Sequence, residues 1–188
     1  MAVRSILITG DPVLHTPAAE VTDFGPGLAS LVADMFETMD AAPGVGLAGP
    51  QVGEPLRLFV YGWTDDAGTL FRGVAVNPEL WLSPVLPGDA DEDDESEGCL
   101  SVPGERFPLR RAERVILRAV DPTGAPFEIR ASGWLARVFQ HEFDHLDGIL
   151  YVDRLETGWR KPAAKAIRRS GWGAPGSSWL PGRDDLDA

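Results

Sequence analysis

The sequence predicts an α+β fold in which mixed or antiparallel sheets pack around a central helix that carries a His-Glu-x-x-His motif. Three observations lead to this prediction. Apolar residues recur at helical spacing in two segments, 28–39 and 134–146, which indicates amphipathic helices. Short segments rich in Val, Ile, Leu and Phe, bounded by turn residues, indicate strands. Two of these segments, 115–121 and 127–131, flank the turn Asp121-Pro122-Thr123-Gly124 and predict a β-hairpin.

The elements before the hairpin follow from the same patterns. We expect a first strand within 5–9, a helix from Pro26 to about Ala41, and further strands at 56–61 and 73–77. Asn77-Pro78 should end the last of these strands, because proline restricts the residue before it. After the hairpin, Ser132 or Gly133 should open the motif helix, Gly148 should cap it, and a basic helix should cover Arg160–Arg169.

Composition narrows the class of protein. The chain has 188 residues, of which 44% are hydrophobic and 24% charged, as in ordinary globular domains. No segment approaches a membrane span, and the N-terminal segment lacks the pattern of a signal peptide, so we expect a cytoplasmic protein with no membrane partner. The net charge of -12 argues against nucleic acid as a direct substrate. Much of this charge lies in residues 89–97, a run typical of a solvated loop.

The segment Gly44–Gly53 contains four glycines in ten residues. Such a density predicts backbone turns and a close approach of the backbone to another group. Its spacing matches neither a dinucleotide-binding fingerprint nor a phosphate-binding loop. Two interpretations stay open at this point. The segment is either a plain connector between helix and strand, or a strip of backbone along which an extended ligand lies, with Gln51 supplying an amide donor.

The motif helix carries the main chemical signal. His141 and His145 are four residues apart, so their imidazoles lie on one side of a helix, the arrangement that a metal ion needs. Glu142 lies about 100° round the helix from His141, which suits a carboxylate beside a metal-bound water. Trp134 and Val138 share the face of the two histidines, as expected for an apolar pocket with a metal at one end. The alternative is a solvated helix that carries two histidines by coincidence.

A catalytic zinc-like site has three protein ligands and one position for water. The chain has three histidines and one cysteine. His15 lies in a loop with no other ligand type at suitable spacing, so the third ligand should be Cys99 or a carboxylate. Cys99 lies in a segment bounded by glycine and proline, which favours a positioned backbone, and a thiolate suits iron or zinc.

Three segments together resemble the three motifs of the peptide deformylase family: Gly44–Gly53, Glu97–Ser101 and Gln140–Gly148. Their order and spacing agree with the family, and the resemblance continues to about Arg169. Gly49 departs from the alanine that is usual there, and little effect is expected because only its backbone is needed. We therefore expect residues 1–169 to form a single catalytic domain. Residues 170–188, rich in Gly, Ser, Pro and Asp, should form a flexible C-terminal tail.

The resemblance implies a metal-dependent hydrolase that removes the N-formyl group from the initiator methionine of newly made bacterial proteins and releases formate. Cys99, His141 and His145 would hold one divalent metal, Fe²⁺ in the cell, with Zn²⁺, Ni²⁺ or Co²⁺ as substitutes. The metal would lower the pKa of its bound water. Glu142 would act as general base and then acid. The side chain of Gln51 and the backbone N–H of Leu100 would stabilise the oxyanion.

The resemblance also implies how the substrate, an N-formylmethionyl nascent peptide, is held. Val45, Trp134, Val138 and the His141 ring would form the slot for the methionine side chain. The peptide would lie extended between two backbone segments, Val45-Gly46 and Glu97-Gly98, as an added strand. Arg106 would contact the peptide further along. Glu97 and Gln140 would either orient the site or be structural, and Asp144 would either orient an imidazole or be a charge on the helix surface.

Two rival functions remain open from the residues alone. A metallopeptidase that cuts internal peptide bonds also carries His-Glu-x-x-His, although a cysteine as third ligand argues against it. A non-catalytic metal-binding module would fill all four coordination positions with protein groups. The basic segment Arg160–Arg169 is either a solvated helix or a surface that contacts the ribosome, as the family resemblance suggests.

Overall fold

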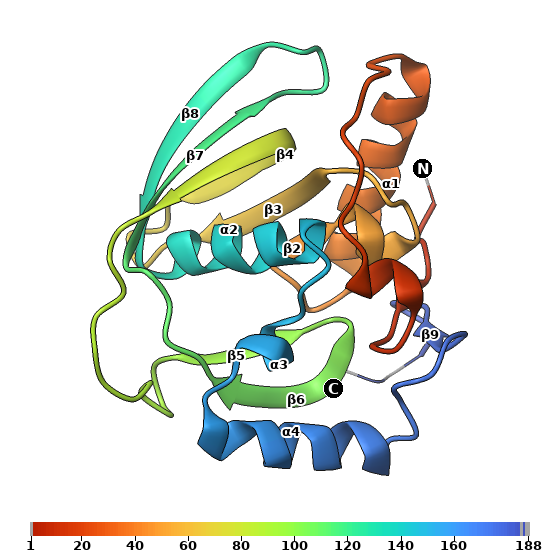
Figure 1. The fold of residues 1–188 in the computed structure, drawn as a ribbon. Coiled ribbons are helices and arrows are strands. Elements are labelled where there is room, and N and C mark those ends of the chain that lie inside the picture. The colour runs from red at the N-terminus through yellow and green to blue at the C-terminus, as the bar shows by residue number, and fades with distance from the viewer. Residues whose placement is uncertain (1, 185, 187–188) are drawn as a thin grey trace.

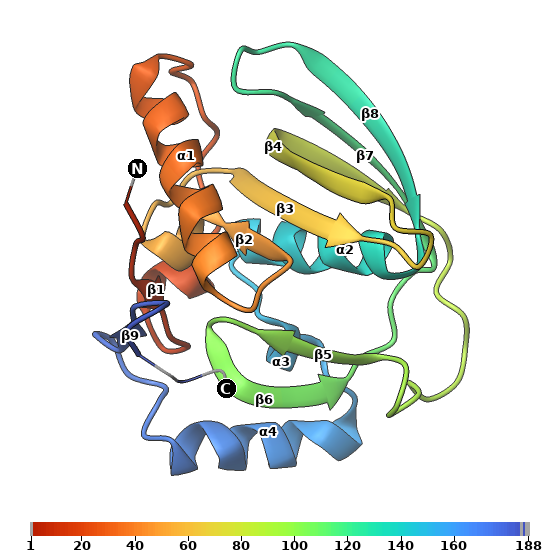
Figure 2. The ribbon, with the colours of Figure 1, turned by 180° about the vertical axis from the view of Figure 1, so that it is seen from behind.

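A computed structural model describes residues 2–184 and 186. Three layers are visible in Figure 1: a five-stranded sheet, the helix α2 (Gly133–Leu146), and a lower unit of strands and helices. The helix α2 lies between the other two layers in both views (Figures 1 and 2). The prediction of an α+β fold with antiparallel sheets around the motif-bearing helix is thus confirmed.

The five-stranded sheet is antiparallel throughout, with the order β2-β3-β4-β7-β8. Its strands are β2 (Gly46–Ala48), β3 (Leu58–Thr64), β4 (Leu70–Leu82), β7 (Arg114–Val120) and β8 (Pro126–Ser132). The predicted hairpin is β7–β8. Its turn closes through the Asp121 carboxylate, which accepts hydrogen bonds from the backbone N–H groups of Thr123 and Ala125, and Gly124 supplies a φ of +83°.

The prediction that β4 ends at Asn77-Pro78 is wrong. The strand continues to Leu82 across a bulge between Val76 and Glu79. Asn77 adopts a left-handed conformation (φ +48°), and its side-chain amide pairs with both the backbone N–H and the carbonyl of Val21 at 2.8 and 2.9 Å. These bonds stabilise the irregular backbone, so that proline at a bulge interrupts the ladder without ending the strand.

The helix α1 (Pro26–Ala41) has the predicted bounds and lies beside the sheet (Figure 2). Its apolar face packs against the sheet. Its buried residues Leu28, Leu31, Met35 and Met39 lie at helical spacing and form a cluster with strand residues such as Val60. Two short 3₁₀ helices that periodicity does not predict, η1 (Pro12–His15) and η2 (Gly49–Val52), flank this region. The second one turns the glycine-rich segment back toward β3.

The lower unit consists of the β5 (Ser96–Cys99) and β6 (Val102–Pro108) hairpin with α3 (Tyr151–Arg154) and α4 (Thr157–Arg169). Its core contains Phe107, Leu150, Tyr151 and Ala163, all buried. On the opposite side of α2, Leu135, Phe139 and Leu146 pack against the sheet. The helix α2 is therefore buried on two sides, which holds the side chains between them in fixed positions.

Part of the segment that we expected to be a flexible tail, residues 170–188, packs on the domain. The strand β9 (Ser178–Trp179) pairs antiparallel with β1 (Ile6–Leu7), and Trp179 is only 3% exposed. The glycine- and serine-rich composition suggested flexibility, but this segment also contains Trp179, a large apolar residue that packs in the core. Residues 185, 187 and 188 of that predicted tail lie outside the described residues. Across the described chain, none of the helices combines the length and apolar character that crossing a membrane requires.

Candidate metal centre and active site

The helix α2 presents His141 and His145 on one side, as their spacing predicts. The two rings lie 5.0 Å apart between centroids and at 76° to each other. Cys99, at the end of β5, meets them from the lower unit, and its Sγ lies 3.3 Å from His145 Nε2. The ligand atoms of these three residues all lie within 4.8 Å of one another, and the residues are buried. The structure thus brings together the three predicted ligands.

This donor set fits a divalent transition metal. One thiolate and two imidazoles are typical ligands of zinc and iron, and three protein ligands leave a coordination position open. Within the described part of the chain, the Glu142 carboxylate oxygen Oε2 is buried beside this group without a hydrogen-bond partner. A buried polar atom without a partner is costly, so its retention next to the ligands is consistent with a functional group.

Burial sets the proton affinity of Glu142. The side chain is enclosed, and desolvation raises its pKa to about 7. Gly46 on β2 provides the space for it, because a Cβ atom on Gly46 would lie 2.7 Å from the Glu142 Cδ atom. A carboxyl group with a pKa near neutrality can both accept and return a proton at physiological pH.

Gln51 lies on η2 and reaches the same centre. Its amide nitrogen is 3.8 Å from Cys99 Sγ and 3.3 Å from Ser101 Oγ, while its Oε1 accepts a hydrogen bond from the backbone N–H of Ala48. This last bond fixes which end of the amide faces the sulfur. Leu100, the other predicted oxyanion donor, lines the same cavity.

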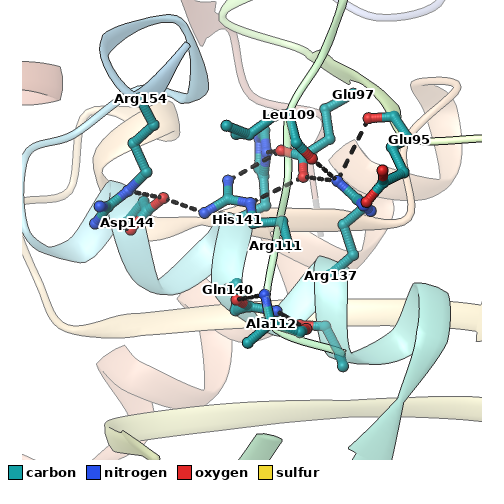
Figure 3. A network of polar contacts seen from close by, with 11 residues as sticks. Glu95, Glu97, Leu109, Arg111, Ala112, Arg137, Gln140, His141, Asp144 and Arg154 are labelled. Atoms are coloured by element: carbon teal, nitrogen blue, oxygen red, sulfur yellow. Dashed lines mark hydrogen bonds and ion pairs between the residues drawn. The ribbon is translucent and has the colours of Figure 1, made fainter. Parts of the chain in front are cut away.

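A buried network of charges supports His141 (Figure 3). His141 Nδ1 lies 3.1 Å from the Glu97 carboxylate, which leaves Nε2 for a metal. Arg111 contacts Glu97 at 2.9 Å through two nitrogens and Asp144 at 2.6 Å through a third. Burial alone would raise the pKa of Glu97, but Arg111 and His141 together hold it well below its usual range.

The sequence did not indicate the arginines of this network. Arg111 and Arg137 both bind Glu97, and Arg154 binds Asp144. Asp144 was expected to orient an imidazole or to lie on the helix surface, and instead it is buried between two arginines. The acidic residue on the motif helix was the available signal, but the sequence does not reveal that it is buried or which arginine pairs with it.

Gln140 has a structural position. Its side-chain amide accepts from the backbone N–H of Ala112 and donates to the carbonyl of the same residue, at 3.0 and 2.8 Å. The pair of bonds ties α2 to the segment that leads into β7 (Figure 3). Its role in the site is therefore to fix the helix rather than to contact the ligands.

A cavity of about 370 Å³ opens beside the metal ligands, between β2, β5, β6 and α2. Every residue predicted to bind substrate lines this cavity. They are Val45, Gly46, Glu97, Gly98, Arg106, Trp134, Val138 and His141. Trp63 on β3 also lines it and was not predicted; its ring lies 6.1 Å from that of Trp134 at an interplanar angle of 30°. Its position in a strand gave no signal of a site.

Comparison with known proteins gives one consistent family. A family model described as "Polypeptide deformylase" matches residues 3–161. A peptide deformylase of Tropheryma whipplei (strain TW08/27) is 51% identical over 191 residues, which cover 95% of this chain and 94% of the relative. The protein named peptide deformylase 2 of Corynebacterium efficiens is 47% identical, over 98% of this chain and 96% of the relative.

Solved structures agree. A peptide deformylase from Thermus thermophilus superposes with a TM-score of 0.77 at 40% identity, covering 89% of this chain and 94% of that one. A peptide deformylase from Synechococcus elongatus, solved in complex with actinonin, gives a TM-score of 0.75 at 36% identity, covering 89% and 85% of the two chains. The sequence comparison and the structural comparison therefore identify the same family.

Proposed function

This chain belongs to the polypeptide deformylase family, hydrolases that remove the N-formyl group from newly made proteins, and from that premise we propose a role for each residue of its site. Cys99, His141 and His145 hold one divalent cation. The observation that carries this proposal is the convergence of the three ligand atoms within 4.8 Å on buried, fixed elements. When bound, the cation supplies Lewis acidity, which lowers the pKa of a coordinated water and polarises the formyl carbonyl.

The donor set suits several divalent ions. We propose Fe²⁺ in the cell because the family resemblance implies it, with Zn²⁺, Ni²⁺ or Co²⁺ as substitutes in a preparation. The bond between His141 Nδ1 and Glu97 supports the ligand role of His141, since it fixes the ring orientation and directs Nε2 toward the cation.

Glu142 accepts the proton of the attacking water and delivers it to the leaving amine. Burial, which raises its pKa to about 7, matches its proton affinity to this exchange. The amide of Gln51 and the backbone N–H of Leu100 stabilise the oxyanion, a contribution of about 3 kcal/mol for one such donor. The hydrogen bond from Ala48 to Gln51 Oε1 orients that amide before the reaction begins.

The substrate lies in the cavity beside the ligands. Trp134, Val138 and the His141 ring, with Val45 opposite, form the slot for the methionine side chain. The peptide backbone pairs with two segments that line the cavity: Val45-Gly46, at the start of β2, and Glu97-Gly98, in β5 of a different sheet. Arg106, paired with Gly98 across β5 and β6, contacts the peptide further along.

We also propose the setting in which the enzyme acts. Residues 1–169 contain every proposed ligand and catalytic residue of the single catalytic domain, and β9 packs on this domain through its pairing with β1. The protein acts in the cytoplasm, where nascent chains emerge. The basic face of α4 contacts the ribosome; Lys161, Lys165 and Arg168 are exposed on it.

Formate release from formyl-Met-Ala-Ser, measured anaerobically with Fe²⁺ added, tests the proposal. The same peptide without the formyl group is the control, and cleavage of internal bonds without formate release would identify a metallopeptidase instead. Glu142→Gln should keep one metal per chain and lose turnover by orders of magnitude. A Glu142→Gln protein that keeps its turnover would favour a non-catalytic metal-binding module.

Cys99→Ser tests the ligand set separately from turnover. Elemental analysis of the purified variant should show less metal or a different metal, because a hydroxyl is a poorer ligand for these ions than a thiolate. Unchanged content and identity of the metal would remove Cys99 from the ligand set.

A further inference from the structure

Trp179 connects the C-terminal segment to the metal centre. It lies on β9, beyond residue 161, where the match to the family model ends. Its side chain is 3% exposed and packs in the same core cluster as Leu100. The indole nitrogen donates a hydrogen bond of 2.9 Å to the Leu100 carbonyl, a contact between residues 79 positions apart. The indole thus binds the backbone immediately next to a metal ligand.

The accepting carbonyl belongs to the peptide group that joins Leu100 to Ser101. This group is planar, and in a trans peptide its C=O and N–H point in opposite directions. At its other end, the Ser101 N–H lies 3.4 Å from Cys99 Sγ and donates to it. One rigid amide therefore has the Trp179 indole at its oxygen and the Cys99 sulfur at its N–H.

The surrounding backbone holds this arrangement in place. The Thr9 N–H donates to the Ser101 carbonyl at 2.8 Å, and the Gly173 N–H donates to the Thr9 carbonyl at 3.1 Å. The Ile8 N–H donates to the Ser177 carbonyl at 3.0 Å, next to the β1–β9 pair. The segment after α4 is consequently bonded to the turn that follows Cys99 both directly, through Trp179, and through Thr9.

We propose that Trp179 is a positioning residue for the metal centre, acting through the Leu100–Ser101 amide on the Cys99 sulfur. The inference rests on the proposed function, in which Cys99 is a ligand. A donor at the carbonyl oxygen polarises the amide and strengthens the hydrogen bond at its N–H, because bonds in a chain reinforce one another. A stronger N–H bond draws electron density from the thiolate, and such outer contacts tune a bound metal. The hydrogen bond from Trp179 to the Leu100 carbonyl also fixes the turn that carries the Leu100 N–H.

The test uses the full-length protein loaded with Co²⁺, whose thiolate-to-cobalt absorption band reports the electron density on sulfur. In Trp179→Phe an aromatic ring stays in the core but the donor is lost. The sulfur then becomes a stronger electron donor, so we expect the band to move to longer wavelength. With Fe²⁺ and formyl-Met-Ala-Ser, kcat should fall roughly tenfold, the lower end of the effect of outer-shell contacts, with KM changed less than about twofold.

Trp172→Phe is the matched control, because Trp172 lies in the same segment and packs on the same core. Within the described residues its indole makes no hydrogen bond, so neither the band nor kcat should change. A second replacement of Trp179, by benzothienylalanine, keeps the bicyclic ring and substitutes sulfur for N–H. It should reproduce the shifted band and lowered kcat even where Trp179→Phe impairs folding.

An unshifted band with unchanged kcat in the benzothienylalanine protein would overturn the proposal and leave Trp179 as a core residue. A fall in kcat only in proportion to lost metal would overturn it as well. Glu142→Gln, assayed in parallel, separates the two levels of inference. If that variant loses turnover while the Trp179 variants match the wild type, the role of Trp179 fails and the proposed function stands.

Discussion

Arg111 offers the sharpest test of what stabilises this site. Its guanidinium makes three charged hydrogen bonds, two to Glu97 at 2.9 Å and one to Asp144 at 2.6 Å. The side chains of Arg111, Glu97 and Asp144 are 7%, 3% and 6% exposed. Replacement of Arg111 by leucine keeps an apolar volume but removes one partner from two buried carboxylates.

The magnitude follows from what each carboxylate retains. Removing one partner of a buried ion pair typically costs about 3–5 kcal/mol, because the other charge stays desolvated. Asp144 keeps two bonds to Arg154, and Glu97 keeps Arg137 and His141. We therefore expect Arg111→Leu to lower the free energy of unfolding by about 3 kcal/mol, the lower end of that range. The total free energy of unfolding of such a domain is about 5–15 kcal/mol.

The assay is urea unfolding of metal-free protein, followed by circular dichroism, so that metal binding does not contribute to the difference. Arg130→Leu is the control, since its ion pair with Glu128 joins side chains that are 75% and 33% exposed. Such surface pairs contribute about 1 kcal/mol or less. If Arg111→Leu costs no more than Arg130→Leu, the buried network does not stabilise the fold and the reasoning is refuted.

Three further predictions address single features of the structure. Gly46→Ala places a methyl group 2.7 Å from Glu142 Cδ, so we expect kcat for formate release to fall by about 100-fold. Gly27→Ala is the control and should leave kcat unchanged, because nothing lies within 4 Å of the added Cβ. Burial raises the pKa of Glu142 from 4.5 to about 7. Between these pH values the folded state binds a proton that the unfolded state lacks, so the free energy of unfolding of the metal-free protein falls as the pH rises. Urea unfolding should then find Glu142→Gln more stable than wild type by about 3 kcal/mol at pH 8 and equal to it near pH 4; equal stability at pH 8 would contradict this. Asn77→Ala loses both bonds to Val21 and keeps a φ of +48°, so urea unfolding should show a loss of about 2 kcal/mol, and a loss under about 0.5 kcal/mol would show that the bulge needs no support.

Local sequence patterns were sufficient to predict those features that a single helix or turn determines. The spacing of apolar residues predicted α1 to within its observed bounds, and the turn chemistry of Asp121 to Gly124 predicted the β7–β8 hairpin. The spacing of His141 and His145 placed both imidazoles together, because a helix fixes that geometry by itself. The end of β4 could not be predicted from local patterns. The hydrogen bonds that stabilise the strand at Asn77 join it to Val21, which is far away in the sequence.

Features that depend on several distant segments could not be predicted in this way. The partners of Arg111 lie 14 and 33 residues away in the sequence, and the residues around Arg111 do not indicate either of them. Ligand chemistry reduced the third ligand to Cys99 or a carboxylate and favoured Cys99, and the family resemblance was needed to select it. Trp179 was overlooked because one buried ring has little weight in the average composition of a Gly-, Ser- and Pro-rich segment.

The pairing of β1 with β9 has a consequence for how this chain acquires activity during its own synthesis. A chain elongated only as far as α4 already contains all three metal ligands and Glu142, yet it lacks the indole that meets Leu100. The first strand cannot pair until a partner more than 170 positions later has been translated. We expect a protein arrested on the ribosome before that point to take up metal and turn over slowly, and release of the finished polypeptide to restore the full rate.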